Sequence, residues 1–285
     1  MNIELIEVLA TLVAVVVPLI IIATVWIVPR ERLQTVRIDY RSRTVAIVPF
    51  ILILGGVLAF NARFRSIAHD ISWWLGFEIT HIIVRIEGDT VARFQEVIGG
   101  DTILFYFSFM YVYGYVFLLV FPLVAYFFLD DLSVFKGLTV AYTLNYAIGF
   151  ILYTLFVAFG PRNIIPELIG QSMHTFYPQL QLLSSAVNEY TNVFPSLHTS
   201  LSATVMLFAW YTRDLYDRWM PIAMFIGASI IVSTMYLAIH WIVDVMAGIA
   251  LASVTYWIAV SAIENGWFES ETFGRVWSRV VGSGE

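Results

Sequence analysis

Hydrophobic residues occur in long runs along this chain, and short polar segments separate the runs. A helix that crosses the apolar core of a bilayer needs roughly 20 such residues. The runs do not alternate with a period of two residues, so strands are not expected. The pattern predicts seven membrane-spanning helices, near residues 5–28, 44–61, 102–128, 137–159, 197–212, 219–239 and 241–264. The predicted fold class is therefore all-α: a polytopic membrane helix bundle with six core transmembrane helices and an extra N-terminal span.

The segment 62–101 has a different pattern, because its apolar residues recur at helical spacing between charged ones. The ionisable residues within it include Glu78, His81, Arg85 and Glu87. Trp73 and Trp74 are typical of the lipid–water boundary. We interpret the segment as one or two amphipathic helices lying on the membrane surface, with an eighth span as the alternative.

The composition excludes an ordinary soluble protein. Of the 285 residues, 60% are hydrophobic and 13% are charged, against roughly 45–50% and about 25% in soluble domains. The mean hydropathy is +0.82. The net charge of −6 and the absence of a basic patch argue against a nucleic-acid partner. Without cysteine, the chain has neither disulfides nor thiol chemistry.

Arginine placement predicts the orientation in the membrane. Five arginines lie between residues 30 and 43, and short basic loops stay on the cytoplasmic side. Seven crossings then place the N-terminus outside. This sequence pattern divides the chain into an N-terminal helix with its basic loop (1–43), helices with an outer amphipathic segment (44–128), a catalytic core (129–264) and a tail (265–285). We expect a multi-pass protein of the cell membrane.

Three short segments carry the candidate chemistry, because ionisable residues at membrane depth are costly and are usually functional. They are GPRNIIPE at 160–167, NVFPSLHTS at 192–200 and YLAIHWIVDVMAG at 236–248. In the predicted topology, all three lie at the outer ends of spans. Residues far apart in the sequence are therefore expected at one level of the membrane.

The residue types at these positions suit phosphoryl transfer. His240 and Asp244 are four residues apart on one helix face, where a carboxylate can orient the ring. A helix that begins near Pro195 offers backbone N–H groups around Ser196 and Leu197 to an anion. Arg162 adds a guanidinium matched to phosphate oxygens, and His198 adds a second imidazole. Together they suggest a phosphohistidine intermediate.

FPSLHTS and HWIVDVMAG resemble the second and third signature motifs of the type 2 phosphatidic acid phosphatase and haloperoxidase superfamily. GPR, PSLH and YLAIHWIVD are most similar to its inositol phosphorylceramide synthase-like branch. The resemblance implies that His240 is the nucleophile, that Asp244 orients it and that His198 protonates the leaving oxygen. It also implies an antiparallel bundle of six core helices and no metal or other cofactor.

Two positions depart from the family pattern. Leu155 stands at the spacing of the first motif's lysine, seven residues before Arg162. Thr234 stands where the third motif usually has an arginine, six residues before His240. The expected phosphate site therefore has two fewer cations than the phosphatase pattern.

The leading hypothesis is an integral-membrane lipid phosphatase or head-group phosphotransferase with its site at the outer face. Its substrate would be a lipid phosphate in the bilayer, and its acceptor would be water or an alcohol such as inositol. One alternative is a non-enzymatic transporter or lipid-binding protein that uses the His–Asp pair as a proton relay. Another is a metal site built from His198, His240 and Asp244.

Overall fold

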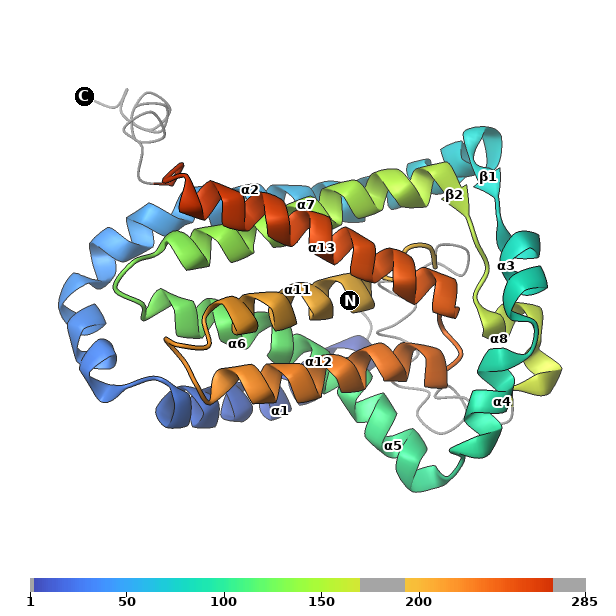
Figure 1. Ribbon diagram of the computed structural model, residues 1–285, viewed down its shortest axis with the longest axis horizontal. Helices are drawn as coiled ribbons and strands as arrows, with labels where there is room; N and C mark the ends of the chain where they lie inside the picture. Colours follow the sequence, from blue (N-terminus) through green and yellow to red (C-terminus); the bar gives the residue numbers. More distant parts are fainter. Residues whose placement is uncertain (1–2, 170–192, 269–285) are drawn as a thin grey trace.

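The computed structural model describes residues 3–169 and 193–268, and long helices make up most of these residues (Figure 1). The long helices are α1 (Ile3–Ile27), α2 (Arg30–Leu75), α6 (Tyr115–Phe127), α7 (Ser133–Leu155), α11 (Leu197–Tyr211), α12 (Trp219–Tyr236) and α13 (Ile242–Glu264). Their axes run along the length of the molecule, except that the first part of α2 crosses one end and bends at Asp39 into the long part (Figure 1). The all-α helical bundle expected from the hydrophobic runs is confirmed.

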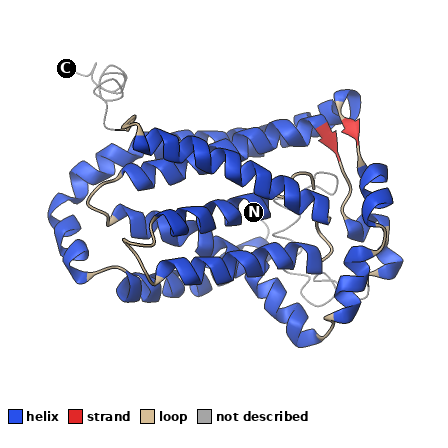
Figure 2. Ribbon diagram, viewed as in Figure 1, coloured by secondary structure: helices blue, strands red, loops and turns tan. Residues whose placement is uncertain are grey.

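Short elements close one end of the bundle. They are α3 (Thr80–Glu87), α4 (Thr90–Val97), α8 (Pro161–Ile164) and the 3₁₀ turn η2 (Pro166–Leu168). The helix α5 (Asp101–Phe109) belongs instead to the apolar segment Asp101–Phe127. The two strands seen in Figure 2, β1 (Phe77–Glu78) and β2 (Phe156–Val157), pair in parallel at this end. A π-helical turn, η1 (Met110–Gly114), joins α5 to α6.

Six helical segments of the described chain are long and apolar enough to cross a membrane. They are Ile6–Ile27, Ile38–Leu75, Asp101–Phe127, Ser133–Leu155, Trp219–Tyr236 and Ile242–Glu264. The remaining predicted span, 197–212, is the 15-residue helix α11, about 22 Å long at 1.5 Å per residue. This helix packs against α6, α7, α12 and α13, so protein rather than lipid surrounds it.

The second predicted span is shorter than the helix that the structure contains. The sequence suggested an end near residue 61, but α2 continues to Leu75. Asn61 does not end the helix, because its side chain donates a hydrogen bond to the carbonyl of Tyr146 on α7 (3.1 Å). Residues 62–75 therefore belong to α2. The amphipathic part is restricted to α3 and α4, which have eight residues each and are too short to span a bilayer.

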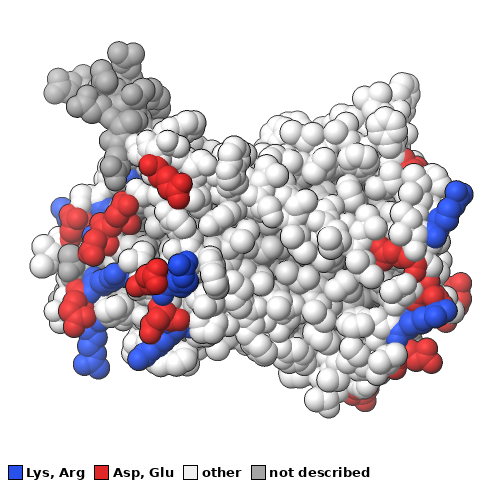
Figure 3. All heavy atoms as spheres, viewed as in Figure 1, with Lys and Arg blue, Asp and Glu red and all other residues white. Residues whose placement is uncertain are grey.

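Charged side chains gather at the two ends of the molecule and leave a broad uncharged belt between them (Figure 3). We call the end with α3, α4 and α8 the site end. The opposite end holds the α1–α2, α6–α7 and α11–α12 connections (Figure 1). There Arg43 donates to the carbonyl of Leu129 (2.5 Å) and Arg218 donates to the carbonyl of Trp26 (3.0 Å). The belt and the apolar helices identify a multi-pass membrane protein.

A buried polar network joins three helices inside this belt. Asn145 of α7 is fully buried, and its amide donates to Thr204 of α11 (3.2 Å) and to Thr255 of α13 (2.8 Å). The hydroxyl of Ser200 donates to the Asn145 side-chain oxygen. A buried amide in an apolar bundle is costly unless all its groups are paired, so this network favours one relative arrangement of the three helices.

Asn145→Leu should lower the thermal stability of the protein in detergent. The substitution keeps the volume but removes three interhelical hydrogen bonds, at about 0.6 kcal/mol each in membrane bundles, so we expect a loss of about 2 kcal/mol. Ser253→Ala is the control, because Ser253 is exposed on α13 and bonds only to the carbonyl of Ile249. Equal unfolding midpoints for the two variants would contradict a stabilising role for the network.

Candidate active site

The three motifs lie together at the site end of the bundle (Figure 1). The first motif follows α7 through β2 into α8, the second runs into the first turn of α11, and the third joins the end of α12 to the start of α13. Hydrogen bonds join all three: the Arg162 amide donates to the Ala238 carbonyl (3.1 Å), and the Ser196 amide donates to the Asp244 carbonyl (3.0 Å). The structure thus brings these residues together at one level of the bundle.

A tight turn carries His240 between α12 and α13. The carbonyl of Thr234 accepts hydrogen bonds from the amides of both Ile239 and His240, each at 3.1 Å. Ala238 has a positive φ of 53°, a left-handed conformation that costs roughly 1–2 kcal/mol for a residue with a Cβ. Backbone strain of this kind persists where the surrounding structure holds it, often at a functional site.

His240 and Asp244 are adjacent and almost completely buried. The Nδ1 of His240 lies 3.5 Å from Oδ2 of Asp244, longer than a well-formed N–H···O hydrogen bond. The same Oδ2 accepts the Trp241 amide (2.8 Å), so Asp244 also caps the first turn of its own helix. Among the described residues, neither Nδ1 of His240 nor Oδ1 of Asp244 has a hydrogen-bond partner.

Ser196 caps α11, and Pro195 precedes this cap. The Ser196 hydroxyl accepts a hydrogen bond from the Thr199 amide (3.3 Å). The Ser196 amide donates to the backbone carbonyl of Asp244. The hydroxyl of Tyr153 on α7 lies near the Leu197 amide. The Ser196 amide therefore already has a protein partner, and a hydroxyl lies beside the Leu197 amide. An anion at this helix end would have to compete with those partners.

His198 lies in the first turn of α11, as expected, and two tyrosines enclose its ring. Tyr111 stacks on it with ring centroids 4.4 Å apart and an interplanar angle of 18°, and Tyr115 lies 4.2 Å away. Tyr111 lies within the π-helical turn η1, and π-helical turns are frequent at functional sites. Sequence reasoning did not find the tyrosines, because they lie in an apolar run with no polar break.

Arg162 is the second residue of α8, which docks on the His240 turn. Gly160 makes this approach possible: a Cβ built there would lie 2.4 Å from the carbonyl oxygen of Ile239 and 3.3 Å from Val193. The Arg162 side chain is half-buried. The glycine of the GPR motif is therefore explained by close backbone packing between the first and third motifs.

The strand β1 and the start of α3 pack against the residues that precede α8 and α13. The Trp241 indole donates to the carbonyl of Phe159 (2.8 Å), and the Phe159 amide donates to the hydroxyl of Thr80 (3.0 Å). The β1–β2 pairing extends this contact. The amphipathic segment is therefore part of the site's framework rather than a separate surface helix.

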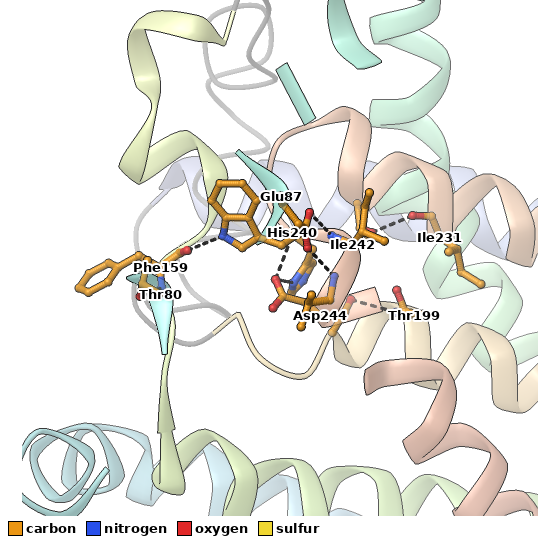
Figure 4. A network of polar contacts seen from close by, with 12 residues as sticks. Thr80, Glu87, Phe159, Thr199, Ile231, His240, Ile242 and Asp244 are labelled. Carbon is orange, nitrogen blue, oxygen red and sulfur yellow. Dashed lines mark hydrogen bonds and ion pairs between the residues drawn. The ribbon is translucent and has the colours of Figure 1, made fainter. Parts of the chain in front are cut away.

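Glu87, at the end of α3, makes the most direct of these contacts (Figure 4). Its two carboxylate oxygens accept the amides of Ile242 (2.8 Å) and Val243 (2.7 Å), the first residues of α13. Burial raises the pKa of Glu87 above its ordinary value, the nearby charge of Asp244 adds to this shift, and the two amides oppose it. The sequence showed only a charge that interrupts an apolar helix face. A glutamate on an apolar helix face indicates an unusual position, but nothing in the sequence indicates that its partners are the amides of α13.

The two departures from the phosphatase pattern have different surroundings. Leu155 is 42% exposed at the end of α7, on the outside of the bundle. Thr234 is fully buried, and its hydroxyl donates to the carbonyl of Ile231 on the same helix (2.7 Å). Within residues 3–169 and 193–268, no three His, Asp or Glu side chains are grouped as a metal site.

The protein is thus a polytopic membrane helix bundle with a buried His–Asp pair and a second histidine at one end. A family model described as the PAP2 superfamily matches residues 74–258, more than half of the chain, and the chain belongs to that superfamily. The match begins before the motif-bearing core and includes α3 and α4. Neither the curated proteins nor the solved structures contain a match to this chain.

Gly160→Ala should impair both folding and turnover. The new methyl group would meet the Ile239 carbonyl, which is backbone and cannot turn aside, and overpacking of this kind costs about 1–3 kcal/mol. We expect a lower unfolding midpoint and a large loss of lipid phosphate hydrolysis. Gly56→Ala on α2 is the control, because a Cβ there meets nothing within 4 Å. Wild-type turnover in Gly160→Ala would contradict the close-packing explanation.

Proposed function

We propose that this protein is a membrane enzyme that removes or transfers a phosphoryl-containing group of a lipid phosphate. The observation that supports it is the convergence of Arg162, His198, His240 and Asp244 from three separate segments at one end of the bundle. PAP2 superfamily membership supports a phosphatase or phosphotransferase activity. A site at the end of a bundle, near the level of lipid head groups, suits a substrate whose tails remain in the bilayer.

The proposed reaction begins with attack of His240 on phosphorus. Since Nδ1 faces Asp244, Nε2 is the nitrogen that forms the bond, and Asp244 stabilises the charge that develops on the ring. The bond from phosphorus to the leaving oxygen breaks, and His198 donates a proton to that oxygen. In the second half-reaction His198 takes a proton from the acceptor, whose oxygen displaces His240.

Arg162 is the proposed cation for the phosphate oxygens. A guanidinium offers two parallel N–H donors to a phosphate, and the phosphate gains charge density on these oxygens during transfer. The backbone around Ser196 and Leu197 completes the proposed cradle, with the anion replacing the Asp244 carbonyl that the Ser196 amide now binds. No metal or other cofactor takes part in this proposal.

The acceptor decides between hydrolysis and transfer. The similarity of the motifs to the inositol phosphorylceramide synthase-like branch favours an alcohol acceptor such as inositol, whereas the phosphatase pattern favours water. Both reactions share the first half-reaction. Purified protein incubated with lipid phosphates, with and without inositol, distinguishes them, because free phosphate marks hydrolysis and a new lipid head group marks transfer.

His240→Ala and His198→Ala should fail in different ways. Without His240 no covalent intermediate forms, so turnover should be abolished on every substrate. Without His198 the leaving group lacks its acid, which is worth about 10²–10⁴-fold. Hydrolysis of an aryl phosphate, whose phenolate leaves without protonation, should therefore be much less impaired than hydrolysis of the natural lipid. Equal losses on both substrates would reject the role of His198, and turnover by His240→Ala would reject the proposed function.

We also propose that the site end faces the outside of the cell membrane. The support is the arginine cluster at the opposite end, because short basic segments remain in the cytoplasm. The absence of native cysteine allows a direct test. A cysteine at Glu96, exposed on α4, should react with a membrane-impermeant maleimide in intact cells, whereas one at Asp214 in the α11–α12 connection should not. The reverse pattern would place the site in the cytoplasm.

A further inference from the structure

We infer that Glu87 is a positioning residue, which holds the first turn of α13 so that Asp244 remains available to His240. This inference rests on the proposed function, because it concerns the geometry of the proposed nucleophile. Glu87 lies on α3, more than 150 residues before its partners Ile242 and Val243. The contact joins α3, in the amphipathic segment, to the helix start that follows the turn carrying His240.

Backbone amides rather than a cation stabilise the buried carboxylate of Glu87. The side chain is 8% exposed, and within the described chain no arginine, lysine or histidine forms a salt bridge with it. A buried carboxylate without a cation is costly. Its compensation is two charge-assisted hydrogen bonds from backbone amides and the positive end of the α13 dipole. These two hydrogen bonds fix the start of α13 against α3.

The first turn of α13 divides its amides between two carboxylates. The Trp241 amide binds Oδ2 of Asp244, and the next two amides bind Glu87. Because Glu87 satisfies those two donors, Oδ1 of Asp244 keeps no bond to the helix backbone. Asp244 can then approach Nδ1 of His240, which lies 3.5 Å from Oδ2.

Loss of Glu87 would change this division. The amides of Ile242 and Val243 would be left unpaired in a buried place, which is unfavourable. Asp244 is the carboxylate of the same helical turn, so it would be drawn toward these donors and away from the imidazole. The turn that carries His240 joins α13 directly through Trp241, and it would move with the helix end.

The same contact has a consequence for substrate binding. A helix N-terminus attracts anions through its free amides, but Glu87 already occupies those of Ile242 and Val243 with a negative charge. The substrate phosphate is therefore not expected to bind these two amides. Glu87 does not touch the phosphate, and its loss should affect the chemical step more than binding.

The test compares Glu87→Gln and Glu87→Ala with the matched control Glu96→Gln, which changes an exposed glutamate on α4. Glu87→Gln keeps one acceptor oxygen and Glu87→Ala keeps none. We expect kcat for a short-chain lipid phosphate to fall about 10- to 100-fold in Glu87→Gln, as for one lost charge-assisted hydrogen bond, and further in Glu87→Ala. KM should stay within about twofold, and Glu96→Gln should equal wild type.

Two readouts do not require turnover. His240 is 3% exposed, so its carbethoxylation by diethyl pyrocarbonate, followed by mass spectrometry, should be slow in wild type and several-fold faster in Glu87→Gln. Amide hydrogen exchange in a peptide spanning 241–246 should also accelerate.

Wild-type kcat in Glu87→Gln, or a lowered kcat with unchanged carbethoxylation and exchange, would overturn the inference. A raised KM at unchanged kcat would also overturn it, since Glu87 would then act on binding. Turnover by His240→Ala would instead overturn the proposed function. In that case the carbethoxylation and exchange rates would still decide whether Glu87 positions the turn.

Discussion

The start of α13 is the constraint on which the rest of the site depends. The first amides of a helix have no partner within the helix, and here they lie in a buried region beside a histidine. Two carboxylates satisfy them: Asp244 from the same turn and Glu87 from α3. The position of His240, one residue before the helix cap Trp241, follows from how these bonds fix the turn.

The other elements at this end support the same turn from different sides. Gly160 lets the first motif approach the backbone of Ile239, and the Arg162 amide binds the Ala238 carbonyl. Ser196 links the start of α11 to the backbone of Asp244. Backbone contacts rather than long side chains make these connections, so the geometry of the site depends on helix packing. The buried network around Asn145 contributes to that packing from within the membrane belt.

The chain belongs to the PAP2 superfamily, yet its proposed phosphate site has an unusual charge balance. Leucine and threonine carry no charge, so positions 155 and 234 supply no cation. Leu155 faces outward, and Thr234 is buried against its own helix. Tyr111 and Tyr115 enclose His198, and the Tyr153 hydroxyl lies near the Leu197 amide. Aromatic and neutral groups thus surround the proposed acid, and Arg162 is the cation proposed for the substrate.

The sequence by itself determined the fold class and the three motifs that the structure brings together. Long apolar runs predict spanning helices because a bilayer core admits little else, and the spacing of His240 and Asp244 places both on one helix face. It could not determine the end of α2, since Asn61 is satisfied only by a contact with α7. Nor could it assign Glu87 or Tyr111, whose partners lie far away in the chain. Only the tertiary structure decided these contacts, because packing alone brings α3 to the free amides of α13 and the ring of Tyr111 onto that of His198.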